Sequence, residues 1–366
     1  MKENLYDLLR RYEFNKTEPE TLIQLVDRAI QRGGEAKEEL ALLRDAARRL
    51  LGPLRDGGLI QAVAPQDIGT VRSKTVGGVD GSFMPVGGAG GKWYVPLSCA
   101  TLIFPEGINS SPQVTVESGI EVVHESESLN VGGLAACIEM ALESKAILKF
   151  GSKFQNSILF IDGPIVDPPF YDNPDYVHHR SSAIRATVNN GNLVIACAKR
   201  VRDSFLKKVA SDLLPAEIKY ISRFPTDLQL LLFLFSEFWR DPTTADLVLA
   251  TTPVNATAVG PDIYKKYQDE GVTVWSLFIQ LTKTSSMLRL DLPTLDASDN
   301  GKPALSQIVD AVTAWSYPGH HIPLPVFLAD EKCRIRTGCA EVLYQEIMTR
   351  TATADPLDQI VITQLR

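Results

Sequence analysis

Two short stretches of the sequence end in the same way: VGGVDGS at residues 76–82 and LFIDGP at residues 159–164. Each is an apolar run, typical of a strand, that leads into an aspartate followed by glycine; the aspartates are Asp80 and Asp162. Asp-Gly is a common turn dipeptide, so either pair alone predicts only a turn. Two carboxylates at the ends of neighbouring strands would instead repel each other unless a divalent cation lay between them. Both a turn and a metal site are open at this point.

The apolar pattern around these stretches predicts an α/β protein. Residues 74–124 contain three β-rich runs, which we expect to form an antiparallel meander. Helical spacing over 131–151 predicts a helix, and SILFIDGPI at 157–165 predicts a buried strand after it. A meander followed by strands mixed with helices implies a mixed β-sheet flanked by helices. The later elements expected are strands at 192–200, 272–283 and 286–293, helices at 201–214 and 228–239, and one long helix at the end of 321–350.

The N-terminal part has a different sequence pattern. Residues 3–55 carry apolar residues at helical spacing, with abundant Arg and Glu between them. We expect a pair of amphipathic helices, broken at Gly33–Gly34 and ended by Gly52–Pro53, that packs on the core or on a second subunit. The expected organisation is an N-terminal helical arm, then one α/β domain with a helical insertion; these cover 1–70, 71–366 and about 201–270.

The composition fits a globular protein with a sizeable core, since 45% of the 366 residues are hydrophobic and 22% are charged. The formal net charge of −7 argues against a surface that coats nucleic acid everywhere, but it permits a local basic groove. The five cysteines lack the pairing of metal ligands, so we expect them to be reduced and the protein to be cytoplasmic. No apolar run approaches the ~20 residues that cross a bilayer, so no membrane partner is expected.

Further carboxylates lie on the helix expected between the two Asp-Gly stretches. Glu139 and Glu143 are four residues apart and share one side of that helix. Glu139 lies nearer the apolar stretch and is the better candidate for a site, whereas Glu143 is expected to be solvated. Because the available ligands are oxygens, the cation would be Mg²⁺ or Mn²⁺.

A basic segment follows the strand at 192–200. Such side chains bind phosphates without reading sequence, and their first members would lie near the same sheet edge as the aspartates. The alternative is a solvated basic helix. The candidate DNA-binding residues of this segment are Lys199, Arg200, Arg202 and Lys207.

The ordered set of these segments resembles the NurA nuclease family. VGGVDGS, a helix bearing Glu139, and LFIDGPI come first, and LVIACAKRVRDSFL then places Lys199 at the position of the family's lysine. LRLDLP resembles the family's Arg–x–acid–x–Pro strand and adds Arg289 as a DNA-binding candidate. YPGHHIPLPVFLAD resembles the proline-rich lead into the last helix. The match covers roughly residues 74–350.

The resemblance implies an RNase H-like nuclease core that cuts DNA with Mn²⁺ or Mg²⁺, two ions per active site. Carried onto this chain, the family's Asp–Glu–Asp set falls on Asp80, Glu139 and Asp162. Two metal ions ~3.5–4 Å apart activate a water molecule and stabilise the leaving 3′ oxygen. The resemblance also implies a homodimer that works with a hexameric HerA-type ATPase. Repair of DNA breaks and defence against foreign DNA are both compatible with it.

One departure from the family concerns the last helix, where the family has a tyrosine and then a histidine. This chain offers Leu324 and Asp330 in the corresponding stretch, and Asp330 is the expected fourth ligand. The departure favours an alternative, a catalytically weak nuclease-like adaptor that docks the translocase, whereas the intact acidic set argues against it. A third possibility is a glycoside hydrolase with Asp80 and Asp162 as acid and base, which metal dependence would distinguish.

Overall fold

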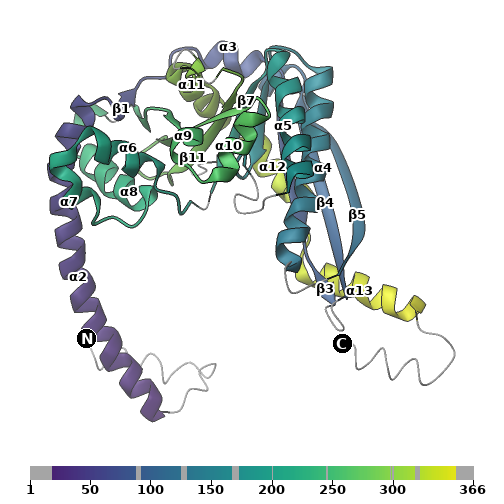
Figure 1. The fold of residues 1–366 in the computed structure, drawn as a ribbon, viewed down its shortest axis with the longest axis horizontal. Coiled ribbons are helices and arrows are strands. Elements are labelled where there is room, and N and C mark those ends of the chain that lie inside the picture. The colour runs from purple at the N-terminus through teal and green to yellow at the C-terminus, as the bar shows by residue number, and fades with distance from the viewer. Residues whose placement is uncertain are drawn as a thin grey trace.

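The computed structural model describes most of the chain as an α/β protein, with a large mixed sheet flanked by helices. Helix α2 (Pro19–Asp56) projects from the body on one side, and the long strands β4 (Lys92–Phe104) and β5 (Gln113–His124) extend on the other (Figure 1). None of the described helices is both long and apolar enough to cross a bilayer. The described residues are 19–351, without 88–91, 125–129, 167–172, 200, 245, 297, 299–300 and 318–321.

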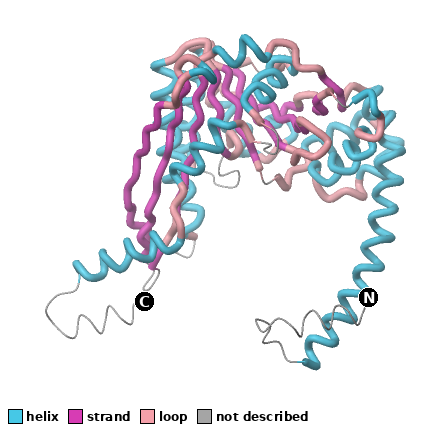
Figure 2. Tube along the Cα trace, turned by 180° about the vertical axis from the view of Figure 1, so that it is seen from behind, coloured by secondary structure: helices cyan, strands magenta, loops and turns pink. Residues whose placement is uncertain are grey.

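Five strands form the part of the sheet that carries the opening stretches. β2 (Val76–Phe83), β4 and β5 make the expected antiparallel meander, and the last two run side by side in Figure 2. β6 (Ile158–Asp162) lies parallel to β2, and β7 (Leu193–Ala198) lies parallel to β6. The order β5-β4-β2-β6-β7 is an RNase H-like arrangement, so the expected fold class is confirmed.

Two helices connect the parallel strands and cover one face of the sheet. α4 (Val131–Lys153) joins β5 to β6, as expected, and α5 (Pro174–Asn189) joins β6 to β7. The composition of 167–180, rich in Pro, Asp and Tyr, favours an exposed loop by sequence alone, and α5 shows that this expectation is wrong from Pro174 onward. Asn173 caps α5 by accepting a hydrogen bond from the backbone amide of Asp175, and proline occupies the first turn, where its missing donor costs nothing.

The sheet continues beyond β7 through antiparallel strands. β11 (Leu288–Thr294) pairs with β7, β10 (Thr273–Gln280) with β11, β8 (Val248–Thr251) with β10, and β1 (Ile60–Val63) with β8. The short strands are β3 (Val86–Gly87) and β9 (Val254–Asn255). The range 201–270 thus contains strands besides its helices. The remaining helices are α3 (Ile68–Ser73), α6 (Phe205–Leu213), α7 (Ile218–Ile221), α8 (Asp227–Phe238), α9 (Ala256–Val259), α10 (Asp262–Asp269) and α11 (Leu305–Trp315).

Helix α2 is one continuous helix, so the expected break at Gly33–Gly34 is wrong, as is the stop at Gly52–Pro53. Each glycine costs a helix only about 1 kcal/mol relative to alanine, and the ion pair between Arg32 and Glu35 at 2.6 Å spans the glycine pair. The C-terminal half of α2 is fixed by packing against α8, where Leu50 and Leu54 are fully buried. The helix expected before residue 19 lies outside the described residues.

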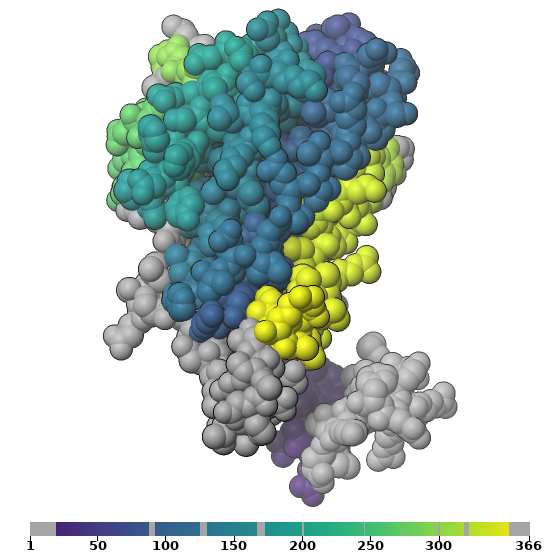
Figure 3. All heavy atoms as spheres, turned by 90° about the vertical axis from the view of Figure 1, so that its right-hand side faces the viewer, coloured from purple at the N-terminus to yellow at the C-terminus, as the bar shows by residue number. Residues whose placement is uncertain are grey.

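The C-terminal part forms two helices instead of one long helix. α12 (Leu324–Cys333) packs on β2 and β4, and α13 (Thr337–Thr351) packs near β3. Figure 3 shows these C-terminal helices in yellow beside the blue segment of β4, β5 and α4. Between them, the backbone amide of Ile335 donates to Ser82 Oγ on β2, which ties the connection to the sheet.

Candidate metal centre

Alternation along β2 decides which way its side chains point. A Cβ added to Gly77 would lie 2.5 Å from the Phe150 ring of α4, so this face carries α4. A Cβ added to Gly78 would lie 2.7 Å from Pro325 Cβ of α12 and closer still to its carbonyl group. The paired glycines therefore let a helix approach each face of the strand. Asp80, two residues after Gly78, faces α12.

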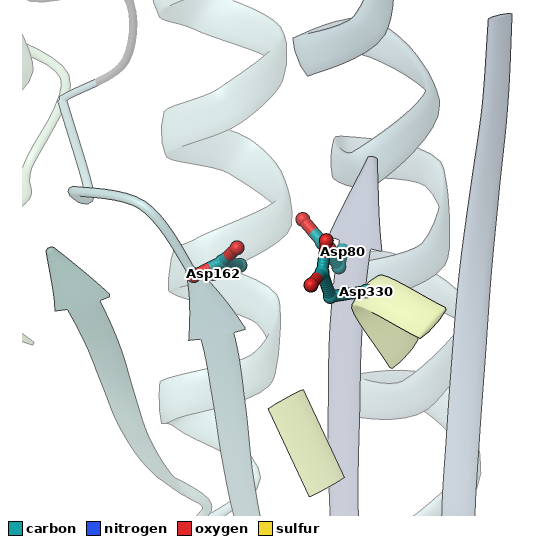
Figure 4. A group of neighbouring side chains, drawn as sticks. All are labelled: Asp80, Asp162 and Asp330. Atoms are coloured by element: carbon teal, nitrogen blue, oxygen red, sulfur yellow. The ribbon is translucent and has the colours of Figure 1, made fainter. Parts of the chain in front are cut away.

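Three carboxylates from distant parts of the chain meet on this face. The parallel pairing of Val79 with Ile161 places Asp80 beside Asp162, and α12 brings Asp330 over both (Figure 4). One oxygen of each carboxylate lies within 4.8 Å of the others. The structure therefore brings together three of the four expected acidic ligands.

The two Asp-Gly pairs have different explanations. Gly163 has a φ of +79°, which belongs to the left-handed region that favours glycine, so the second pair is a turn at the end of β6. Gly81 lies inside β2, and a Cβ there would lie 2.8 Å from Glu139 Oε1. The first glycine is thus needed for the close approach of a carboxylate, and the turn and metal interpretations are not exclusive.

The carboxylates have few partners in the protein. Lys199 Nζ donates to Asp162 Oδ2 at 2.6 Å, and Cys333 Sγ donates to Asp80 Oδ2 at 3.5 Å. Asp330 forms an ion pair with Arg334. The second oxygen of Asp162, Oδ1, is buried and has no hydrogen-bond partner. An acceptor of this kind is costly unless a ligand satisfies it.

Electrostatics of the group favour a cation. Burial is the main cause that raises the pKa of Asp80 to about 9, and the charges of Asp162, Glu143 and Asp330 raise it further against the opposing effect of Lys199. Without a cation, Asp80 therefore holds a proton at neutral pH. Burial by itself would lower the pKa of Lys199, but the Asp162 carboxylate outweighs it and raises that pKa.

The donor set fits a hard divalent cation. All three converging ligands are carboxylate oxygens, the unpartnered Asp162 Oδ1 is one of the oxygens of this group, and the mutual repulsion of the carboxylates is relieved by positive charge. Mg²⁺ and Mn²⁺ prefer such ligands. Asp80, Asp162 and Asp330 are the residues that could hold the ion.

The two glutamates of α4 occupy different places. Glu139 is half-buried against Gly81 and approaches β2 from the face opposite Asp80; it does not belong to the group of three converging carboxylates. Glu143 is buried and accepts a hydrogen bond from Arg180 Nη1 at 2.9 Å. The expectation that Glu143 is solvated is therefore wrong, because α5 supplies a buried cation where the sequence predicted a loop.

The basic candidates separate into distinct places. Lys199 lies at the carboxylates, Arg202 is exposed nearby in sequence, and Arg200 lies outside the described residues. Lys207 and Lys208 line an open hollow of about 700 Å³, which none of the three carboxylates lines. Among the described basic residues of this segment, only Lys199 contacts the candidate centre directly.

Arg289 does not fit the predicted contact with DNA. Its side chain is only 4% exposed, and its guanidinium pairs with Asp291 at 2.8 Å and with Asp203. Its strand partner is Ala198, which packs in the core on the α4 face, so Arg289 points away from the carboxylate group. The arginine instead ties β11 to the loop between β7 and α6.

Sequence reasoning missed Cys333 and Arg180, and it expected Glu143 to be solvated. The Asn-Pro dipeptide at 173–174 is a helix-start signal that could have revealed α5, and with it the position of Arg180. Nothing local in the sequence indicates that Cys333 contacts Asp80, since 253 positions separate them.

An RNase H-like sheet in which three carboxylates converge beside β2 is an arrangement suited to metal-dependent hydrolysis of phosphodiesters. A family model described as the NurA domain matches residues 74–335, and the chain belongs to this family. A comparison with curated protein sequences found no significant match.

Comparison with solved structures includes one that shares the fold. The NurA nuclease from Sulfolobus solfataricus is 11% identical, with a TM-score of 0.60 over 93% of this chain and 100% of that chain. Endonuclease V from Bacillus subtilis is 11% identical, with a TM-score of 0.35 over 81% of this chain and 92% of its own. Human endonuclease V is 16% identical, with a TM-score of 0.37 over 81% and 96%. The likeness to the Sulfolobus protein shows a shared fold over nearly the whole of both chains.

Proposed function

We propose that this protein is a metal-dependent deoxyribonuclease that hydrolyses phosphodiester bonds at the centre formed by Asp80, Asp162 and Asp330. The observation that carries the proposal is the convergence of these carboxylates within 4.8 Å, with a buried and unpartnered oxygen on Asp162. Membership of the NurA family supports DNA as the substrate.

The residues of the chain have distinct tasks in this reaction. When bound, the ions would activate water and stabilise the leaving 3′ oxygen of the scissile phosphodiester. Asp80, Asp162 and Asp330 would hold the ions, and Asp80 would have to lose its proton to serve as a ligand. Glu139 approaches Gly81 on the α4 side of β2, opposite Asp80, so the proposed centre does not include it as a ligand.

Cys333 positions one carboxylate of the centre, and Arg180 stabilises the helix packing behind the sheet. Arg180 binds Glu143 and fixes α4 against α5, on the face of the sheet opposite Asp80. Cys333 donates to Asp80, which fixes the rotamer of that carboxylate relative to α12. Both contacts are made by buried side chains, and of the two only the Cys333 contact acts on the centre directly.

We also propose two ions of Mn²⁺ or Mg²⁺ per site, a homodimer, a hexameric HerA-type ATPase as partner, and a cytoplasmic location. The family supports the partner and the dimer, and the all-oxygen donor set supports the metals. The five cysteines are all free, which supports a reducing compartment. The division into an arm over 1–70 and a nuclease domain over 71–366 is supported by the family match, which begins at residue 74.

One assay tests the proposal. Purified protein is incubated with linear single- and double-stranded DNA in Mn²⁺, Mg²⁺ or EDTA, with and without the ATPase. We expect cleavage that requires the metal, no cleavage by Asp80→Ala, and full cleavage by Asp262→Ala, which removes an exposed carboxylate on α10. Cleavage that persists in EDTA or in Asp80→Ala would contradict the mechanism.

The adaptor remains the second candidate function, because Leu324 and Asp330 replace the tyrosine and histidine expected by resemblance. Its signature would be a chain that binds the ATPase but does not cleave DNA in any metal. The position of Asp330 within the acidic group supports the nuclease over the adaptor, since an adaptor has no need for a third converging carboxylate.

A further inference from the structure

Lys199 stands among the carboxylates of the candidate centre. It follows the last residue of β7 directly, and the parallel pairing of Asp162 with Cys197 places it at the same sheet edge as Asp162. Its ammonium donates to Asp162 Oδ2 at 2.6 Å, and the charges of Asp80 and Asp330 act on it as well. The ammonium therefore lies among the three converging side chains and pairs directly with the Asp162 carboxylate.

A second cation touches the group but differs in kind. Arg334 pairs with Asp330 from one turn further along the same chain segment, and it also pairs with Glu331 at 2.9 Å. Its side chain is exposed, so this is a surface contact that water screens. The Lys199–Asp162 pair is more enclosed, with the two side chains 30% and 15% exposed.

Lys199 occupies a carboxylate oxygen that a metal ion needs as a ligand. Asp162 Oδ2 cannot bind a divalent cation at full strength while it holds an ammonium, because like charges would then share one oxygen. The lysine side chain has a flexible four-carbon stem and a compact charge, so it can leave Asp162 without any change in the backbone. Its side chain is 30% exposed, so a phosphate can approach it from solvent.

We propose that Lys199 is a built-in counter-ion of the metal-free centre, which a divalent cation displaces from Asp162, and that the released ammonium then binds a phosphate oxygen of the DNA. This inference rests on the proposed function, since it needs a metal at Asp162. Metal binding releases the Lys199 ammonium, which can then bind DNA, and bound DNA holds this ammonium away from Asp162. Each ligand therefore strengthens the binding of the other by the same factor.

The first test measures Mn²⁺ binding to the metal-free full-length protein by isothermal titration calorimetry. We expect Lys199→Met to bind Mn²⁺ about tenfold more tightly than the wild type. In the wild type, Mn²⁺ has to break the charge-assisted hydrogen bond between Lys199 and Asp162, and the variant lacks this bond. Lys199→Arg keeps the positive charge and should stay close to the wild type. Lys265→Met is the matched control, because it removes an ammonium that pairs with Asp262 at 3.1 Å on the exposed helix α10.

The second test measures the coupling to DNA. Fluorescence anisotropy of a labelled single-stranded oligonucleotide is recorded in EDTA and in Ca²⁺, an oxygen-seeking cation, with the oligonucleotide checked for cleavage on a gel. The wild type and Lys265→Met should bind the oligonucleotide more tightly in Ca²⁺ than in EDTA. Lys199→Met should lose most of this gain, because it has no ammonium to release.

The outcomes separate the inference from the proposed function. If Lys199→Met melts at the wild-type temperature but binds Mn²⁺ equally or more weakly, the counter-ion role is wrong and the nuclease proposal stands. If Lys199→Met binds Mn²⁺ more tightly but gains as much DNA affinity in Ca²⁺ as the wild type, Lys199 does not move to a phosphate, and that part of the inference is wrong. If the wild type itself binds no Mn²⁺, both the proposed function and this inference fail. Should Lys199→Met not fold, Lys199→Gln replaces it, with the same expectation.

Discussion

Gly78→Ala tests whether the docking of α12 sets the geometry of the centre. A Cβ at this position would lie 2.7 Å from Pro325 Cβ and closer still to the Pro325 carbonyl group, whereas ordinary contact begins at 3.4 Å. Most of the conflict is with backbone, so no rotamer change can relieve it. α12 must therefore move away from β2 by about 1 Å, and Asp330 moves with it.

The expected cost follows from this displacement. Overpacking of a well-packed core costs about 1–3 kcal/mol of unfolding free energy, and α12 is well packed here, because Val326 and Ala329 are fully buried. A misplacement of about 1 Å at a reacting centre can reduce turnover about 100-fold. We therefore expect a modest loss of stability together with a large loss of cleavage and weaker binding of Mn²⁺.

The assay combines urea unfolding, followed by circular dichroism, with Mn²⁺ calorimetry and DNA cleavage on the same preparations. Gly34→Ala is the control, because that glycine lies inside α2 with no atom within 4 Å of an added Cβ, and the change should stabilise the helix by about 1 kcal/mol. A Gly78→Ala protein with wild-type stability and wild-type Mn²⁺ affinity would refute the reasoning. Lost stability with unchanged Mn²⁺ affinity would show that Asp330 does not depend on this contact.

Two other predictions concern stability away from the carboxylate group. Burial raises the pKa of Asp227 to about 6, above the ordinary 3.8, so the folded chain binds more protons than the unfolded chain between these values. The stability that this group contributes is complete below pH 3.8 and is lost as the pH rises through about 6. Between pH 4 and pH 7, the urea midpoint of unfolding should fall less for Asp227→Asn than for the wild type. Equal falls would contradict the raised pKa of Asp227. Separately, Arg180→Met leaves the Glu143 carboxylate buried without its ion-pair partner and should cost about 3–5 kcal/mol. The double variant Glu143→Leu, Arg180→Met should recover part of that loss in the same unfolding assay, and a strictly additive double variant would show that the pair is not coupled.

Local pattern predicted the strands that carry Asp80 and Asp162 because both are apolar runs with a clear end. Their proximity does not follow from chain order, because β3, β4, β5 and α4 lie between β2 and β6; it follows from the RNase H-like order of the strands, which the family resemblance implies. Asp330 could be anticipated only through family resemblance, because 250 positions separate it from Asp80 and no local pattern encodes the docking of α12.

The errors have a common physical cause. The burial of Arg289 depends on its pairing with Asp203, which lies 86 positions earlier, and the burial of Glu143 depends on Arg180, 37 positions later. A long charged side chain is usually solvated, so the sequence alone favours exposure for both. The predicted break in α2 was wrong for a different reason. Neighbouring ion pairs and packing against α8 outweigh the two glycines, each of which costs the helix little.

The docking of α12 also has a consequence for synthesis of the chain. A ribosome adds about 5–20 residues per second, so the segments that carry Asp80 and Asp162 emerge many seconds before the one that carries Asp330. The nascent sheet can form while only two of the three converging carboxylates exist. A prematurely terminated product would therefore carry an incomplete acidic group. Only a chain translated as far as α12 can assemble the whole acidic group, so the centre is completed late in synthesis.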